Sequence, residues 1–471
     1  MTDDLHMLPA TELVARYRDK ELSPVEATEA ALARIEAHNE AVNAFVRIEG
    51  DMALASAKES EARWAKGEPL GPVDGVPTTI KDVTLAKGWP TLRGSKAVDP
   101  EGPWDDDAPA TARLRESGAV LLGKTTTPEF GWKGVTDSPL TGITRNPWNT
   151  NRTPGGSSGG AVASAALGFG ALHIGTDGGG SIRIPSGFTG VFGIKPNFGR
   201  VPAWPASPFG TLSHTGPIAR TVSDAALMLN VISRPDARDW QALPYDGRDY
   251  LDGLEDGVKG LKIAFSLTLG YVDIVDPEIS ERVTAAVRVF EDLGVEVEEV
   301  DPGFESPYEM FRTHWYVGAA KLMEGIAPEK RELMEEGTRE IAAEGAKTPL
   351  LDYLGAVAGR AALGEHMCKF HQTYDLLLTP SLPIPAFAAG IEMPDGDDQE
   401  RWSEWTPFTY PFNLTQQPAA SVPCGFTAEG LPAGLQIVGP MHADALVLRA
   451  ARAYEQLHPF EMPDAPREGD S

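Results

Sequence analysis

The sequence predicts an α/β fold, in which helices cover a β-sheet. Segments with helical spacing of apolar residues alternate with short runs of β-branched residues along most of the 471-residue chain, a pattern typical of this class. Hydrophobic residues make up 42% and charged residues 23% of the chain, which suits a globular protein with a sizeable core. This length allows two or three average domains, although single α/β domains also reach it.

Residues 1–70 are expected to form a helical region that packs on the core. Ser23-Pro24-Val25-Glu26 has the pattern of a capping box with proline at the first helical position. A second helix is predicted over 52–66, with Gly67 as its stop.

Residues 71–235 form the predicted core segment. The stretch 75–83 is short and rich in β-branched residues, which indicates a buried strand with Lys81 near its end. The other elements expected here are a helix over 108–115, strands over 119–123 and 171–175, a helix from Ile182, and a helix over 221–232.

Residues 236–395 are expected to form an inserted, variable lobe, and residues 396–471 to return to the core. The segment 234–260 is rich in Asp, Pro and Gly, which favours an exposed connection. The elements predicted beyond it are a helix over 277–293, strands ending at Val300 and over 376–380, 419–424 and 435–438, and a helix near Ala445.

The charge balance disfavours two classes of partner. Asp and Glu number 68 against 41 Lys and Arg, a formal net charge of −27. Such a field repels nucleic-acid phosphates and anionic membrane surfaces, so we expect neither nucleic acid nor a membrane as a partner.

A cytoplasmic location is expected from three features. Only two cysteines occur, Cys368 and Cys424, so a disulfide framework is not expected. Residues 1–6 lack the basic and apolar regions of a signal peptide. No apolar run approaches the roughly 18 residues that a membrane helix needs.

Two glycine-rich clusters, 155–160 and 176–183, bracket a segment of small residues. Such clusters also occur in flexible loops and in close helix packing. Three glycines directly before Ser181, however, would expose a row of N–H groups beside its hydroxyl. That is how a nucleophile is paired with an oxyanion hole.

Lys81 has two interpretations. An ammonium is rarely buried without a partner, so a structural ion pair with Asp82 or another acid is one of them. The other is a desolvated lysine whose pKa falls until the amine can act as a base.

The motifs together resemble those of the amidase signature family, and the resemblance extends over residues 8–456. The interval between Ser157 and Ser181 also agrees with the family's two catalytic serines, whereas Asn197 stands where the family often has Thr. The motifs are Gly75-Val76-Pro77 with Lys81-Asp82, Gly155 to Gly160, Gly179 to Arg183, Gly193 to Pro196, Gly216 to Arg220, Asn413-Leu414-Thr415 and Gly434-Leu435-Gln436.

The resemblance implies a large mixed central β-sheet covered by helices on both faces, and a Ser–cisSer–Lys triad. Ser181 would be the nucleophile, Lys81 the general base and Ser157 the bridging serine, preceded by a cis peptide bond. A serine hydroxyl becomes a good nucleophile only when a base takes its proton, so Lys81 would have to be neutral. The activity implied is hydrolysis of a carbon–nitrogen bond in a small-molecule amide, and the same residues would also cleave esters or carbamates.

The resemblance assigns supporting roles around Ser181. The oxyanion would lie on N–H groups drawn from Gly178, Gly179, Gly180 and Ser181, and an ion pair of Asp177 with Arg183 would hold the loop. Ser158 is expected to cap a helix rather than to take part in the chemistry.

The substrate pocket is expected to be aromatic, and the family resemblance favours a homodimer. No cofactor and no metal are expected: the glycine clusters lack the Gly-Lys-Ser/Thr of a phosphate loop, and nothing completes the loose ligand spacing of His366, Cys368 and His371. The expected pocket residues are Trp132, Trp204, His314, Trp315 and Tyr410.

Three alternatives remain open. Gly155 to Gly159 fits the nucleophile elbow of α/β-hydrolases, which would make Ser157 the nucleophile and need a histidine such as His214 or His314. Within the amidase signature family, the chain could be the glutaminase (A) subunit of a tRNA-dependent amidotransferase. A non-catalytic binding protein with a relic site is the third.

Overall fold

One mixed β-sheet of 11 strands organises the computed structural model, which describes residues 5–394 and 399–469. The strand order is β1-β3-β2-β6-β8-β7-β12-β13-β11-β9-β10. Strand β2 is parallel to β3 and β6, strand β9 is parallel to β11 and β10, and the other neighbours are antiparallel. The predicted α/β class with a large mixed sheet is therefore confirmed.

The strands are short, and most of those in the middle of the sheet are buried along their whole length. Their bounds are β1 Phe45–Ile48, β2 Pro77–Lys81, β3 Val120–Thr125, β4 Asp137–Ser138, β5 Gly142–Ile143, β6 Leu172–Asp177, β7 Phe192–Lys195, β8 His214–Ala219, β9 Lys262–Phe265, β10 Glu296–Glu299, β11 Leu376–Pro380, β12 Ala419–Phe426 and β13 Pro432–Val438. Strands β4 and β5 form a separate two-stranded sheet.

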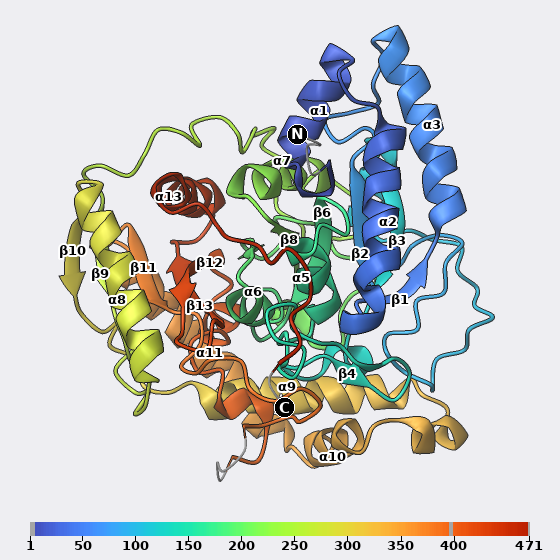
Figure 1. Cartoon of the computed structure of the whole chain (residues 1–471). Helices are drawn as coiled ribbons and strands as arrows, with labels where there is room; N and C mark the ends of the chain where they lie inside the picture. The colour runs from blue at the N-terminus through green and yellow to red at the C-terminus, as the bar shows by residue number, and fades with distance from the viewer. Residues whose placement is uncertain (1–4, 395–398, 470–471) are drawn as a thin grey trace.

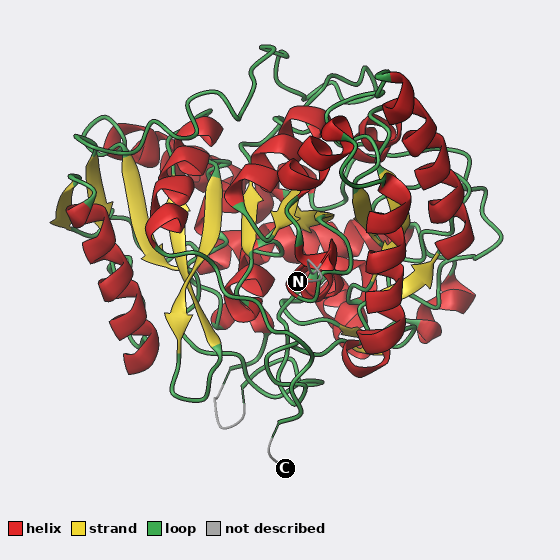
Figure 2. Ribbon diagram, turned by 45° about the horizontal axis from the view of Figure 1, so that its top comes forward, coloured by secondary structure: helices red, strands yellow, loops and turns green. Residues whose placement is uncertain are grey.

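Helices cover both faces of the sheet, and the longest of them lie at its two edges and below it (Figures 1 and 2). The α-helices are α1 Ala10–Asp19, α2 Pro24–Val42, α3 Gly50–Lys66, α4 Pro109–Glu116, α5 Gly159–Ala166, α6 Arg183–Thr189, α7 Val222–Ile232, α8 Pro277–Asp292, α9 Tyr308–Glu324, α10 Glu336–Gly345, α11 Leu350–Phe370, α12 Pro411–Leu414 and α13 Asp444–Leu457. Short 3₁₀ turns are Leu5–Met7, Glu129–Gly131, Gly210–Leu212, Pro328–Leu333 and Trp402–Glu404.

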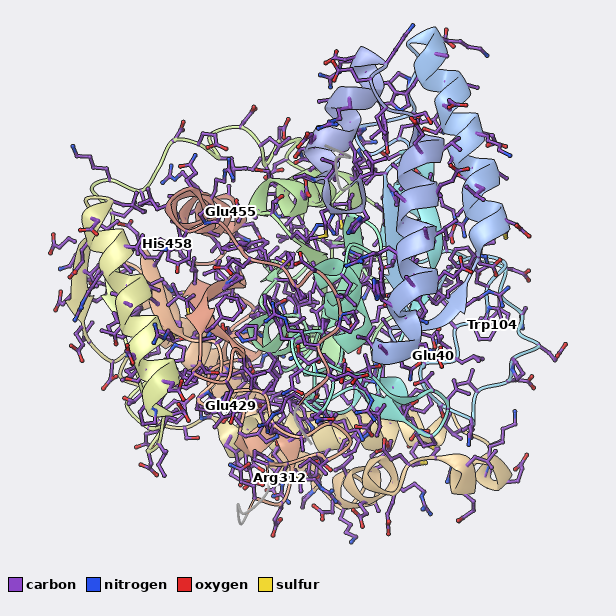
Figure 3. All side chains as sticks on the ribbon, in the orientation of Figure 1. Glu40, Trp104, Arg312, Glu429, Glu455 and His458 are labelled. Carbon is purple, nitrogen blue, oxygen red and sulfur yellow. The ribbon has the colours of Figure 1, made fainter. Side chains whose placement is uncertain are left out.

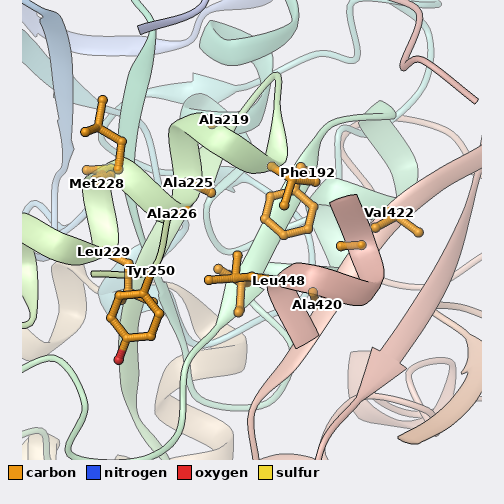
Figure 4. Packing of buried hydrophobic residues seen from close by; sticks show 14 of the residues in the cluster. Phe192, Ala219, Ala225, Ala226, Met228, Leu229, Tyr250, Ala420, Val422 and Leu448 are labelled. Atoms are coloured by element: carbon orange, nitrogen blue, oxygen red, sulfur yellow. The ribbon is translucent and has the colours of Figure 1, made fainter. Parts of the chain in front are cut away.

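The largest apolar core lies between the sheet and helices α1, α4, α7, α8 and α13. Figure 4 shows residues that assemble it: Met228 and Leu229 come from α7, Leu448 from α13, and Phe192, Ala420 and Val422 from strands β7 and β12. Burying large side chains of this kind is the dominant favourable contribution to folding. The core joins segments far apart in the sequence, and so it holds the sheet as one unit.

Local sequence signals determine several of these elements. Ser23 accepts a hydrogen bond from the Glu26 N–H, and the Glu26 side chain accepts one from the Ser23 N–H, so the predicted capping box is present. Helix α3 ends at Gly67, which adopts the left-handed conformation with φ 75°. These two predictions are confirmed.

Two parts of the sheet differ from the expectations. Residues 1–70 contribute strand β1, which pairs with β3 at the edge of the sheet, although this region was expected to be helical. Residues 236–395 contribute β9, β10 and β11 to the sheet; strands were expected where β10 and β11 lie, and only β9 was not expected. Four-residue strands such as β1 and β9 owe their structure to their neighbours, so local pattern alone does not predict them. The segment boundaries stay predictions, and residues 1–4 of the acidic amino terminus lie outside the described ranges.

Acidic side chains are distributed over the outer elements. Glu40 of α2 and Glu429 of the loop before β13 are exposed on separate sides of the molecule (Figure 3). Within the described ranges, no helix combines the length and the apolar character that a bilayer span requires.

We predict that Ile437→Ala lowers the free energy of unfolding by about 2–5 kcal/mol, because truncating a buried, branched apolar side chain leaves a cavity. Ile437 is fully buried in β13, between Ala420 of β12 and Leu378 of β11. Chemical denaturation followed by circular dichroism measures the loss. Ile48, 45% exposed on β1, is the matched control, and an equal effect of Ile48→Ala would contradict the prediction.

Candidate active site

The sheet brings two distant loops to one edge. Strands β2 and β6 are parallel neighbours, with Thr78 opposite Leu172 and Thr79 opposite His173. Parallel strands end at the same edge of a sheet, and binding sites collect there. Lys81 ends β2 and Asp177 ends β6, and so the lysine lies beside the glycine loop that follows Asp177.

The amine of Lys81 is fully buried and surrounded by hydroxyl groups. Its Nζ lies 2.7 Å from Ser157 Oγ, 2.9 Å from Ser158 Oγ and 2.9 Å from Thr176 Oγ1, all within hydrogen-bond distance. Burial lowers the pKa of Lys81 well below the usual lysine value, and the charge of Asp177 opposes this only in part. A buried lysine without a paired carboxylate is therefore disposed to be neutral.

Asp82 does not pair with Lys81, so the ion-pair interpretation of Lys81 is wrong. The carboxylate of Asp82 instead lies 3.4 Å from Nζ of Lys124, and both side chains are buried. Lys124 also donates to Thr84 O at 2.7 Å and to Thr91 Oγ1 at 2.8 Å. This cluster anchors the loop after β2 and takes the neighbouring carboxylate away from Lys81.

Ser157 reaches Lys81 from a tightly packed turn. The Gly156–Ser157 peptide bond is cis, as the resemblance implies. A Cβ on Gly156 would lie 2.4 Å from the carbonyl oxygen of Val135, so only glycine fits there. Gly131 lies on the other side, where a Cβ would be 3.2 Å from Ser157 Oγ.

Ser158 does not cap its helix with its side chain, contrary to expectation. It occupies the N-cap position of α5, yet its hydroxyl makes no capping hydrogen bond. The hydroxyl accepts from Lys81 Nζ and donates to Thr176 O at 3.2 Å. A buried amine needs hydrogen-bond partners inside the protein, and this hydroxyl is one of the three that surround it.

Asp177 and Arg183 form the expected ion pair, with both side chains fully buried. Arg183 Nη2 lies 3.0 Å from Asp177 Oδ1 and Nε lies 3.0 Å from Oδ2, a bidentate arrangement. Burial alone would raise the pKa of Asp177, but the charge and hydrogen bonds of Arg183 outweigh it and hold that pKa far below its usual range. Arg183 also donates to Thr409 O, to Gln436 Oε1 at 2.8 Å and to Asn413 Oδ1 at 2.7 Å.

The glycines after Asp177 are pressed against large side chains. A Cβ on Gly178 would lie 2.9 Å from Trp315, and one on Gly179 would lie 2.7 Å from Phe311. Gly180 has φ 134°, and a Cβ there would lie 2.4 Å from Thr409 Oγ1. The backbone can therefore follow this path only without side chains.

Gly180 is not available as an oxyanion donor, which corrects one part of the expected set. Its N–H donates to Asp177 Oδ1 at 2.8 Å. The N–H groups of Gly178, Gly179 and Ser181 remain as candidates, and the Asp177 carboxylate holds the turn between them.

A cavity of about 480 Å³ opens over these groups. Ser157, Thr176, Gly178 and Ser181 lie in its wall, so the two serines share one site. The backbone N–H of Ser158 donates to Ser181 O at 3.2 Å, which ties the two loops together.

The aromatic residues expected in the pocket divide into two groups. Trp204 and Trp315 line the cavity, whereas Trp132, His314 and Tyr410 do not. Trp132 and Tyr410 are buried in the aromatic cluster behind the cavity wall, with the Trp132 indole donating to Glu335 at 2.9 Å. His314 is packed edge-on against Tyr353 of α11. These three side chains were expected in the pocket because they were assigned to variable loops, but most aromatic side chains of a chain this size belong to the core.

Histidine is not placed to serve Ser157 as a base. His214 also lies at the cavity, but its Nδ1 is 2.7 Å from Leu212 O and its Nε2 is buried. The residues directly before Ser157 form no strand, as a nucleophile elbow would require. Among the described residues, no group of three or more His, Cys, Asp or Glu side chains could hold a metal ion.

Comparison with known proteins agrees with this geometry. A model of the family described as Amidase matches residues 26–448. The chain belongs to the amidase signature family.

Two relatives and one solved structure are similar to this amidase over nearly the whole chain. An acylamidase from Rhodococcus erythropolis is 38% identical over 97% of both chains. The A subunit of glutamyl-tRNA(Gln) amidotransferase from Myxococcus xanthus (strain DK1622) is 37% identical over 98% of this chain and 99% of its own. A bacterial aryl acylamidase of the amidase signature family has a TM-score of 0.90 and 34% identity, with 97% of each chain covered. The chain is an amide-hydrolysing enzyme.

The amidase site contains supporting residues that the sequence did not single out for this role. Thr176 and Ser158 surround the Lys81 amine, while Thr409, Asn413 and Gln436 hold the Arg183 guanidinium. Thr176, Ser158, Asn413 and Gln436 lie within the motifs of the family resemblance or in the glycine-rich clusters. The sequence therefore drew attention to these positions but did not show which residues they contact.

We predict that Lys81→Met stabilises the amidase, by a margin that grows as the pH falls. Because folding lowers the pKa of Lys81, the unfolded chain binds more protons between the two pKa values, and stability rises with pH there. Methionine abolishes this dependence, so its advantage grows by up to about 1.4 kcal/mol per pH unit below the usual lysine value.

Denaturation midpoints of the parent and the variant across a pH series measure this margin. Lys96, which is exposed, is the matched control, because Lys96→Met removes a lysine without removing a buried amine. A margin for Lys81→Met that stays constant with pH would contradict the prediction.

Proposed function

We propose that this enzyme hydrolyses a small-molecule amide through an acyl-enzyme on Ser181, with Ser157 and Lys81 as its proton relay. The observation that carries the proposal is the buried Lys81 amine, 2.7 Å from Ser157 Oγ at the cavity that Ser181 shares. A neutral amine in this position can take a proton, which an ammonium cannot.

Counting hydrogens assigns the direction of the relay. A neutral amine has two N–H donors and one lone pair, yet three hydroxyls lie within 2.9 Å of Nζ. Ser158 donates its own hydrogen to Thr176 O, so it accepts from the amine. The lone pair of the amine can then accept a proton from Ser157 or from Thr176. We assign this role to Ser157, because it lies next to the loop that carries Ser181.

The reaction proceeds in two stages in this proposal. Ser181 Oγ attacks the amide carbonyl as its proton passes to Ser157 Oγ, and the Ser157 proton passes to Lys81 Nζ. The same path in reverse protonates the leaving nitrogen, which departs as an amine or ammonia. Water then attacks the acyl-enzyme and frees the acid, with the relay accepting its proton.

Backbone N–H groups are placed to stabilise the negative charge that develops on the carbonyl oxygen. Gly178 and Ser181 line the cavity, and their N–H groups, together with that of the neighbouring Gly179, are the proposed donors, while the Asp177–Arg183 pair holds their loop. Losing one such donor typically costs about 2.7–4 kcal/mol of transition-state stabilisation. Esters and carbamates present the same carbonyl, so we propose that they are cleaved as side substrates.

A glutaminase subunit is the second candidate, because a relative that is the A subunit of an amidotransferase aligns over nearly the whole chain. Glutamine carries an ammonium group, which requires an acidic partner. Asp239 is the acidic residue in the described cavity wall, and its oxygens already accept from Ala203 N and Gln241 N, both at 2.9 Å. The cavity wall therefore favours an amide without that ammonium.

The proposal extends to the setting of the enzyme. The free thiols of Cys368 and Cys424 support a cytoplasmic location. The homodimer and the absence of a nucleic-acid partner stay predictions.

We expect Ser181→Ala and Lys81→Ala each to lower kcat by at least about a thousand-fold, since a triad acts as a unit. Ser157→Ala should retain a small residue of activity, because water can bridge a short relay. Ser280→Ala on α8 is the matched serine control. Undiminished turnover by Lys81→Ala would refute the relay, and failure of a fluorophosphonate to label Ser181 would indicate a binding protein instead.

A screen of the isolated chain separates the two candidate functions. We expect kcat/KM for apolar anilides to exceed that for glutamine by about tenfold or more, because desolvating an unpaired ammonium is unfavourable. Primary amides, anilides, carbamates, esters and glutamine are compared by product release. Glutaminase activity that appears only with co-purified protein subunits would overturn the small-molecule assignment.

A further inference from the structure

The cavity wall contains a cation that has no partner among the described residues. Arg93 lines the cavity and is partly buried. Within residues 5–394 and 399–469, its guanidinium makes no hydrogen bond, ion pair or ring contact. Arg238, the other arginine of the wall, pairs with Asp236 at 2.7 Å and lies over the Trp204 ring at 4.6 Å.

The fold holds Arg93 close to the catalytic groups. Its N–H donates to the carbonyl oxygen of Asp82, the residue after Lys81, at 3.0 Å. Its own carbonyl accepts from Phe130 N at 2.6 Å, and Phe130 precedes the glycine that packs on Ser157. Arg93 also adopts a left-handed conformation, φ 58°, which is rare for a long side chain and is often found at functional sites.

The neighbouring acid of Arg93 is already occupied. Asp82 is the carboxylate whose charge acts on Arg93, but it is paired with Lys124. Burial lowers the pKa of the Arg93 guanidinium, and Asp82 opposes that change. An arginine nevertheless stays protonated in proteins, so the wall keeps a partly desolvated positive charge that no described residue neutralises by direct contact.

The cavity that Arg93 lines also contains large apolar side chains. Phe130, Val201, Phe209, Trp315 and Ile326 face the same cavity. A ligand that fills it needs an aromatic or alkyl body, and an anion is the group that satisfies the guanidinium. Guanidinium and carboxylate have matching geometry and form two parallel hydrogen bonds.

We propose that Arg93 is a specificity-determining residue that binds a carboxylate of the substrate, so the preferred substrate is an apolar amide carrying one carboxylate and no ammonium. This inference rests on the proposed function, because it concerns the same cavity. The net charge of −27 repels anions at long range, and so the selectivity has to come from a contact inside the cavity.

Two pairs of amides test the proposal, since the carboxylate could belong to the acyl part or to the amine part. The acyl pair is glutaryl para-nitroanilide and isoheptanoyl para-nitroanilide, in which an isopropyl group replaces the carboxylate. The amine pair is the butyryl amides of para-aminobenzoate and para-isopropylaniline. The readout is the ratio of kcat/KM for the charged amide to that for its neutral partner.

We expect Arg93→Gln to lower this ratio by about ten- to hundred-fold for one of the pairs, the size of a lost charge-assisted hydrogen bond. Arg93→Lys should lower it less, because lysine keeps the charge but not the bidentate geometry. Arg238→Gln is the matched control and should keep the ratio. A ratio unchanged by Arg93→Gln in both pairs would overturn the proposal, as would an equal change with Arg238→Gln.

Binding to a protein without its nucleophile separates this proposal from the catalytic one. Calorimetry with Ser181→Ala, alone and combined with Arg93→Gln, measures Kd for the same four amides without turnover. If a charged amide binds the double variant about ten- to hundred-fold more weakly than it binds Ser181→Ala alone, the carboxylate site is supported, even if the parent enzyme hydrolyses none of the four amides. Equal Kd values for both proteins would exclude the site even if hydrolysis is observed.

Discussion

The rest of the site depends on one contact, in which a buried amine is placed among hydroxyl groups instead of carboxylates. Strand β2 carries Lys81 into the interior of the sheet, and Lys124 takes the neighbouring Asp82 away from it. Had Asp82 paired with Lys81, the amine would have been held as an ammonium and could not accept a proton. Lys124 therefore supports the proposed chemistry, because its pairing with Asp82 removes a counter-ion from Lys81.

The Asp177–Arg183 pair performs a different task, which is to connect the catalytic loop to the late part of the chain. A buried ion pair adds little stability unless its remaining hydrogen bonds are satisfied. Here Asn413 and Gln436 bind the guanidinium, and the Asn413 amide also donates to the Asp177 carboxylate at 2.8 Å. The turn that presents Ser181 is thus fixed from the strand before it and from residues more than 200 positions away, which suits a site that must not rearrange as charge develops.

Sequence reasoning predicted the fold class, several helices such as α2, α3 and α7, and the two serines that share the cavity, because these depend on local pattern and on motif order. Sequence reasoning failed where the structure of a residue depends on the residue that it contacts. Strand β1 exists because β3 offers an edge, Ser158 turns to the amine rather than to its helix, and the Gly180 N–H is taken by Asp177. Trp132 and Tyr410 show the same limit, since an aromatic side chain gives no sign of whether it faces a cavity or the cluster behind it.

The distribution of charge separates two proposed tasks of the site, which are to hydrolyse the amide bond and to select the substrate. Near the two serines, Asp177 is paired with Arg183 and Asp82 with Lys124, and burial lowers the pKa of Lys81. A centre of this kind discriminates little between substrates, because each amide offers it the same carbonyl. Discrimination between substrates must then come from the cavity wall. Its apolar side chains select for the size of the substrate, and a cation unpaired among the described residues selects for an anionic group. Arg93 lies outside the relay but is attached to it through Asp82 and Phe130. In the proposed mechanism, a change of its side chain would leave the Lys81 amine and its hydroxyl neighbours in place.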